Sequence, residues 1–159
     1  MEPLNMEPLN VPPRKGPRPD TTNQLPHSQL NQHGPEQVIQ QLHTFCFSFP
    51  EVNNEPSAVA PRGTRAMILD DHAHGNHHAF MIGREFAHIH PYPDNGSMHL
   101  MLSETDAIIV INSGWGEDHY LVTHGYLPKG LILVFSPRDD EELNVLKTIV
   151  TRSYAFATS

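Results

Sequence analysis

The stretch REFAHIHPYPDNGSMHLML, residues 84–102, decides the fold. Residues 86–90 and 97–102 alternate with a period of two, which is typical of β-strands. Between them, residues 91–96 contain two prolines and an Asn-Gly step, both of which are turn signals. The stretch therefore predicts two antiparallel strands joined by a six-residue loop.

Patterns on either side of this hairpin predict the other elements. Helices are expected at 36–46 and at 139–156, where apolar residues recur at helical spacing, and Ser136 or Asp139 can cap the second one. Residues 104–112 suit either a helix capped by Ser103 or a strand. Short apolar runs predict further strands at 58–60, 65–69, 79–82, 120–123 and 130–135. Together they predict a single α+β domain, mainly an antiparallel sheet with helices packed on one face.

Composition divides the chain into two parts. Residues 1–35 carry 8 of the 15 prolines, few aliphatic residues and many Asn and Gln. Such a segment buries too little apolar surface to offset the entropy that ordering would cost. We therefore expect residues 1–35 to be disordered and residues 36–159 to form the folded domain.

Charge and cysteine usage exclude several classes of function. The net charge of -8 lies within residues 36–159, which hold 7 Lys and Arg against 15 Asp and Glu, so nucleic acid is a poor partner. The single cysteine, Cys46, rules out an internal disulfide framework and favours a cytoplasmic location. No apolar run is long enough for a membrane span and no secretory signal is present, so we expect no membrane association.

Twelve histidines are the anomaly of the composition. On a regular strand His88 and His90 share one face while Glu85 points to the other, and His99 joins them if the hairpin register allows it. Three imidazoles on one face could bind zinc, iron or manganese, or act as bases near neutral pH. The alternative is a polar sheet face or a hydrogen-bonded structural pair.

A second concentration of chemistry is GWGEDH, residues 114–119. The indole of Trp115 could stack on a flat substrate, and Glu117 or His119 could transfer a proton. The alternative is a helix C-terminal turn with Trp115 buried. Tyr92 offers another stacking surface, and Arg138 either pairs with a substrate carboxylate or only belongs to the start of the last helix.

The remaining histidines give weaker signals. Four of them lie in the polar loop 70–78, which predicts either a solvated surface or a lid over a site. His27, His33 and His43 suggest no function. The sequence has no nucleotide-binding glycine pattern, nucleophile elbow or zinc-finger spacing. A divalent metal is therefore the one cofactor that the sequence suggests.

Four ordered motifs, at residues 84–90, 97–100, 114–119 and 136–142, resemble the luciferase-like domain of fungal luciferases and of small microbial proteins. The resemblance extends over about residues 36–159. Fungal luciferases oxidise a hydroxylated styryl-pyrone with molecular oxygen, need no known organic cofactor and emit light. The resemblance implies a substrate pocket that includes His88, His90, His99, Trp115, His119 and Arg138.

Two hypotheses follow for function. The first is an enzyme that acts on a small organic substrate by cofactor-independent oxygenation or by acid/base-catalysed cyclisation or isomerisation. The second is a non-catalytic module that binds a small molecule or a metal. In the first hypothesis the catalytic residues are His88, His90, His99, His119 and Arg138. The substrate-binding residues are then Trp115, Tyr92, Glu117 and Glu85, and a metal would be held by His88, His90 and His99.

Overall fold

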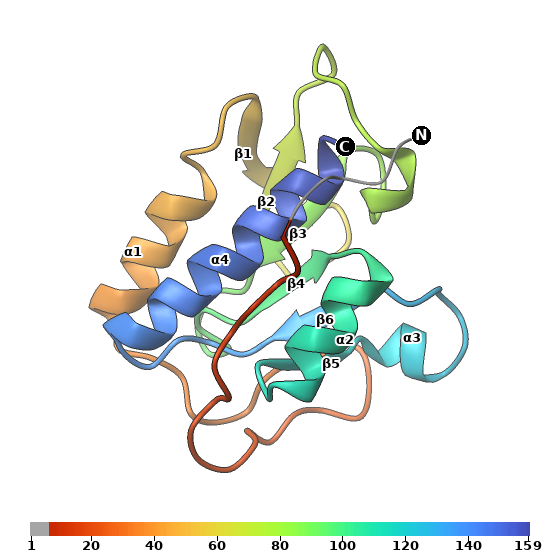
Figure 1. Ribbon diagram of the computed structural model, residues 1–159. Coiled ribbons are helices and arrows are strands. Elements are labelled where there is room, and N and C mark those ends of the chain that lie inside the picture. Colours follow the sequence, from red (N-terminus) through yellow and green to blue (C-terminus); the bar gives the residue numbers. More distant parts are fainter. Residues whose placement is uncertain (1–6) are drawn as a thin grey trace.

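The predicted hairpin lies at the centre of a six-stranded antiparallel sheet in the computed structural model, which describes residues 7–159 (Figure 1). The strand order across the sheet is β1-β2-β3-β4-β6-β5. In chain order the strands are β1 (Val52–Pro56), β2 (Arg65–Leu69), β3 (Glu85–Ile89), β4 (Met98–Met101), β5 (Gly116–Asp118) and β6 (Leu131–Val134).

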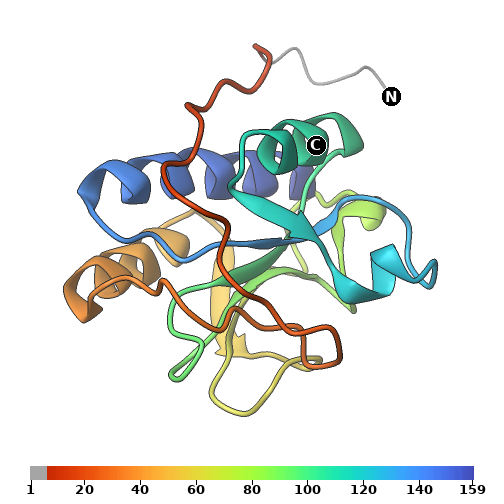
Figure 2. The same cartoon turned by 90° about the horizontal axis from the view of Figure 1, so that it is seen from below.

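The three longest helices cover one face of this sheet, and Figure 2 shows them together on one side of the strands. The longest, α4, packs against β3, β4 and α1, while α2 packs against β5. This arrangement confirms the expected α+β class with helices on one face. The helices are α1 (Glu36–Cys46), the 3-10 turn η1 (His77–Ala79), α2 (Glu104–Asn112), α3 (Tyr120–Thr123) and α4 (Asp140–Ala157). Among residues 7–159, no helix combines the length and the hydrophobicity that a bilayer span requires.

Side-chain caps determine where two of the helices begin. Asp139 accepts a hydrogen bond from the backbone N–H of Glu142 at 2.8 Å, which fixes the start of α4. Ser103 accepts one from the backbone N–H of Asp106 at 3.2 Å, so the segment that suited a helix or a strand is a helix.

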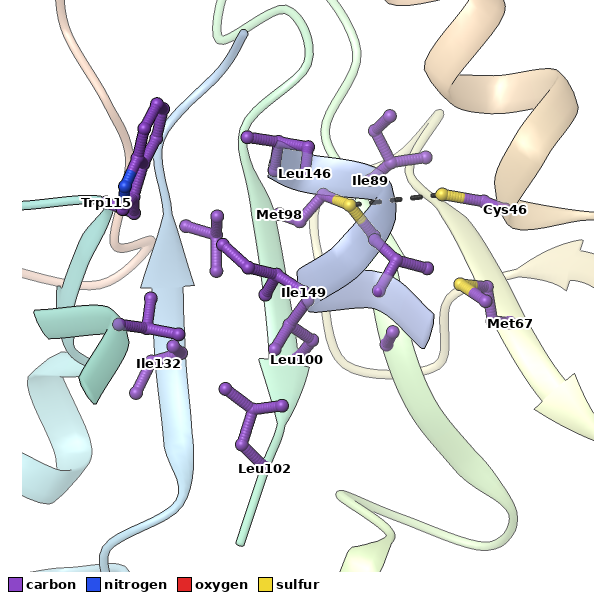
Figure 3. Close-up of a cluster of buried hydrophobic side chains, with 14 of the residues drawn as sticks. Cys46, Met67, Ile89, Met98, Leu100, Leu102, Trp115, Ile132, Leu146 and Ile149 are labelled. Atoms are coloured by element: carbon purple, nitrogen blue, oxygen red, sulfur yellow. Dashed lines mark hydrogen bonds between the residues drawn. The ribbon is translucent and has the colours of Figure 1, made fainter. Parts of the chain in front are cut away.

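The hydrophobic core lies between the sheet and these helices (Figure 3). Leu100 from β4 and Leu146 and Ile149 from α4 are fully buried there. Cys46 from α1 is also in this core, with its Sγ 3.9 Å from the Sδ of Met98. Burial raises the pKa of the Cys46 thiol to about 12, which excludes it as a nucleophile near neutral pH.

Three strand predictions were wrong. Residues 79–82 follow the turn η1 and make only an isolated bridge, between Ile82 and Glu85. Residues 120–123 form α3, because the imidazole of His119 accepts a hydrogen bond from the backbone N–H of Leu121 and so starts a helix. No strand forms at 58–60; the edge strand β1 lies earlier in the chain, where exposed polar residues hide the alternating pattern.

A β-bulge in β3 changes which face Glu85 occupies. Met67 of β2 pairs with Ala87, but its neighbour Ile68 pairs with Glu85, so Phe86 is an extra residue in β3. Phe86 therefore joins the helix-covered core, and Glu85 turns to the opposite face, where the histidines lie. The expectation for a regular strand, with Glu85 on the face away from the histidines, does not hold because of this bulge.

Residues 7–35 lie against the domain in extended and turn conformations, and residues 1–6 of the segment expected to be disordered lie outside the described residues. The indole N–H of Trp115 donates to the carbonyl of Pro12 at 2.6 Å. The side chain of Gln29 accepts a hydrogen bond from the backbone N–H of Ser136 at 2.8 Å. Polar contacts to distant residues, together with the burial of Leu9 and Val11 in the hydrophobic core, hold this part of the chain against the domain. The segment passes the sheet edge, crosses the face opposite the helices, where residues 25–27 line the cavity described below, and then leads into α1 (Figure 2).

Candidate functional site

A cavity of about 780 Å³ lies on the face of the sheet that the long helices leave uncovered. Its size suits a small organic molecule. Apolar side chains form most of its wall, and imidazoles gather on its sheet side. The lining residues are Leu25, Pro26, His27, Val59, Ala60, Pro61, His77, His78, Phe80, Met81, His88, His90, His99, Met101, His119, Leu121, Leu127, Pro128 and Leu131.

Five of these imidazoles, which we call the histidine cluster, are buried next to one another: His27, His88, His90, His99 and His119. The hairpin register pairs His88 with His99, so the condition for a shared histidine face is met, and the ring centres of His90 and His99 are 4.6 Å apart. His119, at the start of α3, approaches His99 from the other side with ring centres 4.5 Å apart. His99 is therefore the central ring of the cluster.

Hydrogen bonds determine which ring nitrogens of His88 and His99 carry protons. Glu85 is held by Ser57 Oγ at 2.8 Å and the backbone N–H of Ala58 at 3.2 Å, so both of its carboxylate oxygens accept hydrogen bonds. The Nδ1 of His88, 2.7 Å from Glu85, must then donate to it. This leaves His88 Nε2 as an acceptor for the Nδ1–H of His99, 3.0 Å away. In the neutral cluster, the Nε2 of His99 carries a lone pair.

That nitrogen is the one ring atom of the described chain that is both deeply buried and without a hydrogen-bond partner. A buried polar atom without a partner costs about 1–3 kcal/mol, so its presence points to a function. We call the line from Glu85 through His88 to His99 the imidazole relay.

His90 has the same arrangement as His88. Its Nδ1 lies 2.8 Å from Ser97 Oγ and 3.3 Å from a carboxylate oxygen of Asp94. With the ring proton on Nδ1 facing that carboxylate, the Nε2 of His90 presents a lone pair. Asp94 is itself fixed, because it accepts a hydrogen bond from the backbone N–H of Gln29 at 3.1 Å.

His119 and His27 have the opposite arrangement. The Nδ1 of His119 accepts from the backbone N–H of Leu121 at 3.0 Å, and the Nδ1 of His27 accepts from that of Tyr120 at 3.2 Å. When neutral, each ring therefore carries its proton on Nε2. The Nε2–H of His27 faces Glu117, 3.4 Å away, while that of His119 has no partner within residues 7–159.

The pKa values of His88, His99 and His119 agree with neutral rings at these three positions. Burial, followed by the neighbouring imidazoles, holds the pKa of His99 well below its usual range. The same causes lower the pKa of His119 to about 4. Burial also lowers the pKa of His88, although its hydrogen bond to Glu85 acts in the other direction. The pKa of Glu85 is lowered because its hydrogen bonds to His88 and Ser57 outweigh the effect of burial.

Other residues predicted for the site lie outside the cavity lining. Trp115 is 3% exposed and belongs to the helix-covered core, so it is not placed to stack on a ligand in the cavity. Tyr92 is 85% exposed at the tip of the β3–β4 loop. Arg138 forms an ion pair with Glu142 at 2.6 Å near the start of α4. These positions agree with the alternatives given above, in which Trp115 is buried and Arg138 belongs to the start of the last helix.

The two predicted carboxylates contact imidazoles of the cluster and do not line the cavity. Glu85 contacts His88 and not the cavity, because the bulge in β3 places it in the relay. Glu117 contacts His27 and Arg18, the latter at 3.2 Å.

Sequence reasoning did not predict a role for His27. No local pattern marks it, because the N-terminal segment carries it across the fold to a position 5.6 Å from His99, measured between ring centres. His77 and His78, from the loop that was expected to be a solvated surface or a lid, line the cavity.

Two groups within the cluster bring three imidazole nitrogens within 4.8 Å of one another: His88, His90 and His99, and also His27, His99 and His119. Either spacing could hold a metal ion. The group predicted from the sequence is the first of these.

Comparison with known proteins identifies the family. A family model described as Luciferase domain matches residues 83–153. A luciferase of Armillaria gallica is 30% identical over 166 aligned residues, which cover 94% of this chain and 62% of that protein. The chain carries a luciferase-like domain. The match confirms the resemblance seen in the four motifs.

Other fungal relatives of this luciferase-like domain match in the same way. A luciferase of Armillaria mellea is also 30% identical over 166 residues, with the same coverage. One of Neonothopanus nambi is 36% identical over 78 residues, which cover 48% of this chain and 29% of that protein. The chain spans less than two thirds of the length of the Armillaria luciferases. No solved structure matches the chain.

Proposed function

We propose that this chain is an enzyme that removes a proton from a small, enolisable organic substrate, which then reacts with molecular oxygen or undergoes cyclisation or isomerisation. The observation that carries the proposal is the imidazole relay, which ends at the unpartnered Nε2 of His99 beside a largely apolar cavity. The family supports an enzyme, because the relatives are named luciferases.

The relay provides the base. A C–H bond next to a substrate carbonyl breaks, the proton goes to His99 Nε2, and its electron pair remains on the substrate as an enolate. Burial lowers the pKa of His99 and so opposes the positive charge that forms there, while the Nδ1–H bond to His88 and, beyond it, the carboxylate of Glu85 offset part of that cost. Glu85 and His88 are positioning residues in this scheme.

His119 provides the complementary group. Its Nε2–H is a donor that remains neutral near pH 7, because its pKa is about 4. A neutral N–H in a water-poor cavity stabilises a developing enolate oxygen without giving up its proton.

Besides isomerisation, in which the enolate takes the proton back from His99 at another carbon, two outcomes are open to the enolate. It can attack an electrophilic carbon of the same molecule and close a ring, and the anion that forms then receives the proton from His99. Alternatively, it can form a carbon–oxygen bond with O₂, which takes two electrons from the substrate; the resulting peroxide anion then receives the proton back from His99. Both routes begin with the same proton transfer.

That shared step is directly measurable. The purified chain is incubated in D₂O with a panel of aryl ketones, β-diketones and unsaturated lactones. NMR follows exchange of the α-proton, and an oxygen electrode follows oxygen uptake. We expect at least one class to exchange faster with the protein than without it, and His99→Gln to slow this exchange about 10²–10⁴-fold.

His43→Gln is the matched control, because His43 lies on α1 and outside the cavity lining. It should leave the exchange rate unchanged. Tight binding of these compounds without exchange or oxygen uptake would contradict the proposal and favour a non-catalytic binding module.

A further inference from the structure

We infer that His88, His90 and His99 form a binding site for one divalent transition-metal ion, and that the ion replaces the proton that His99 shares with His88. The inference goes beyond the proposed function. It is tested without a substrate, so the failure of one does not imply the failure of the other.

The spacing of the relay suits two ligands of one metal ion. His88 Nε2 and His99 Nδ1 are 3.0 Å apart. Two nitrogens at about 2.1 Å from a metal and at a right angle to one another are separated by about 3.0 Å. Because the two rings face each other along a hydrogen bond, each must turn until its lone pair points at the ion. A third imidazole, His90, has a nitrogen within 4.8 Å of both.

The groups behind the rings strengthen the assignment. Metal-binding histidines commonly donate their second ring N–H to a carboxylate, which orients the ring and raises its basicity. His88 has this contact with Glu85 at 2.7 Å, and His90 has Asp94 at 3.3 Å together with Ser97. Both rings are thereby oriented with Nε2 as the ligand atom, which in His88 exchanges the hydrogen bond from His99 for the ion.

The same reasoning rejects the second group. His27 and His119 already use Nδ1 to accept backbone N–H bonds, so their Nε2 atoms carry protons. Binding a metal through Nε2 would move each proton to Nδ1, where it would face a backbone N–H. Both hydrogen bonds would be lost, and His27 would also lose its contact with Glu117.

Metal binding would change what His99 can do. When the ion binds Nδ1 of His99, the proton from that atom moves to Nε2, and the lone pair there is lost. His99 Nε2 then donates a hydrogen bond instead of accepting a proton. The ion and the proposed base reaction therefore exclude each other, and a metal-loaded chain should not exchange substrate protons.

Isothermal titration of the chain without a His-tag, using Co²⁺ and then Zn²⁺, tests the site. We expect one tight ion per chain, and a visible Co²⁺ absorption spectrum from nitrogen and oxygen ligands. The double variant His88→Gln, His90→Gln should lose this ion. Far-UV circular dichroism and urea unfolding verify that the variant is folded.

Two further variants make the test specific. Glu85→Gln keeps a hydrogen-bond acceptor behind His88 but removes the charge, and should weaken binding about 10–100-fold. His119→Gln is the matched control from the rejected group and should keep affinity within about threefold of the original protein.

Three results would overturn the inference: no tight ion in the original protein, the same stoichiometry in the double variant, or loss of the ion in His119→Gln. If the double variant does not fold, Glu85→Gln and His119→Gln still decide between the two groups.

Discussion

The two faces of the sheet differ in what covers them and in what their buried residues do. On β4, Leu100 points into the core beneath α4, while its neighbour His99 points into the cavity on the opposite face. One face is closed by amphipathic helices and apolar contacts. The other is closed by the N-terminal segment and loops, around polar groups whose hydrogen bonds are almost all made. Because successive residues of a strand face opposite sides of the sheet, neighbouring residues of β4 belong to the core on one face and to the cavity on the other.

The largest expected effect tests the helix-covered face. Leu100→Ala removes a fully buried side chain beneath α4 and should lower the free energy of unfolding by about 2–5 kcal/mol, as measured by urea denaturation. His99→Gln is the comparison from the next position in β4 and should cost less than half as much. Equal losses would show that the two faces do not divide stability and chemistry in this way.

The next effect tests how the cavity face is closed. Gln29→Ala leaves the buried backbone N–H of Ser136 without its acceptor, so we expect a loss of about 1–3 kcal/mol in the free energy of unfolding. Limited proteolysis should also cut the N-terminal segment faster. Gln40→Ala, on the exposed side of α1, is the matched control and should change neither quantity. Unchanged proteolysis in Gln29→Ala would mean that other contacts hold the segment.

The smallest effect tests the contact between α4, which covers one face of the sheet, and the N-terminal segment, which covers the other. Arg138 bonds Glu142 of α4 and also Gln32 of the N-terminal segment. Burial alone would raise the pKa of Glu142, but the hydrogen bonds and charge of Arg138 outweigh it and lower that pKa below its ordinary value of 4.5. The carboxylate therefore adds stability above pH 4.5, and this contribution is lost as the pH falls below it.

Glu142→Gln removes this contribution. The original protein should be more stable than the variant at about pH 6, and the difference should shrink as the pH falls below 4.5. Urea unfolding at several pH values measures it, with the exposed Glu141→Gln as control. A difference that does not depend on pH would show that the carboxylate charge is not what stabilises this contact.

Local patterns predicted the centre of this molecule well. The hairpin follows from alternation and turn residues, and the structure supplies the register that the sequence left open, which pairs His88 with His99. The caps of α2 and α4 were also readable, because a capping side chain lies three residues from the N–H that it binds.

Other features depend on contacts between distant residues, which no local pattern records. The bulge that brings Glu85 to His88 appears only when β3 pairs with β2. His27 reaches the cluster because Gln29 and its neighbours bind residues more than 60 positions away. Trp115 is the converse case, since its flanking glycines suggested a ligand contact, whereas Gly116 allows close packing against the backbone of Leu133.

The cavity is lined both by residues inside the segment that matches the Luciferase domain and by residues outside it. The segment that matches the Luciferase domain, residues 83–153, supplies four of the five clustered imidazoles. Much of the remaining lining comes from residues 25–27, 59–61 and 77–81, outside that segment. Substitutions in these outer loops can reshape the space around a ligand without touching the relay. Under the proposed function, the matched segment would determine the reaction and the outer loops would determine which molecules the cavity accepts.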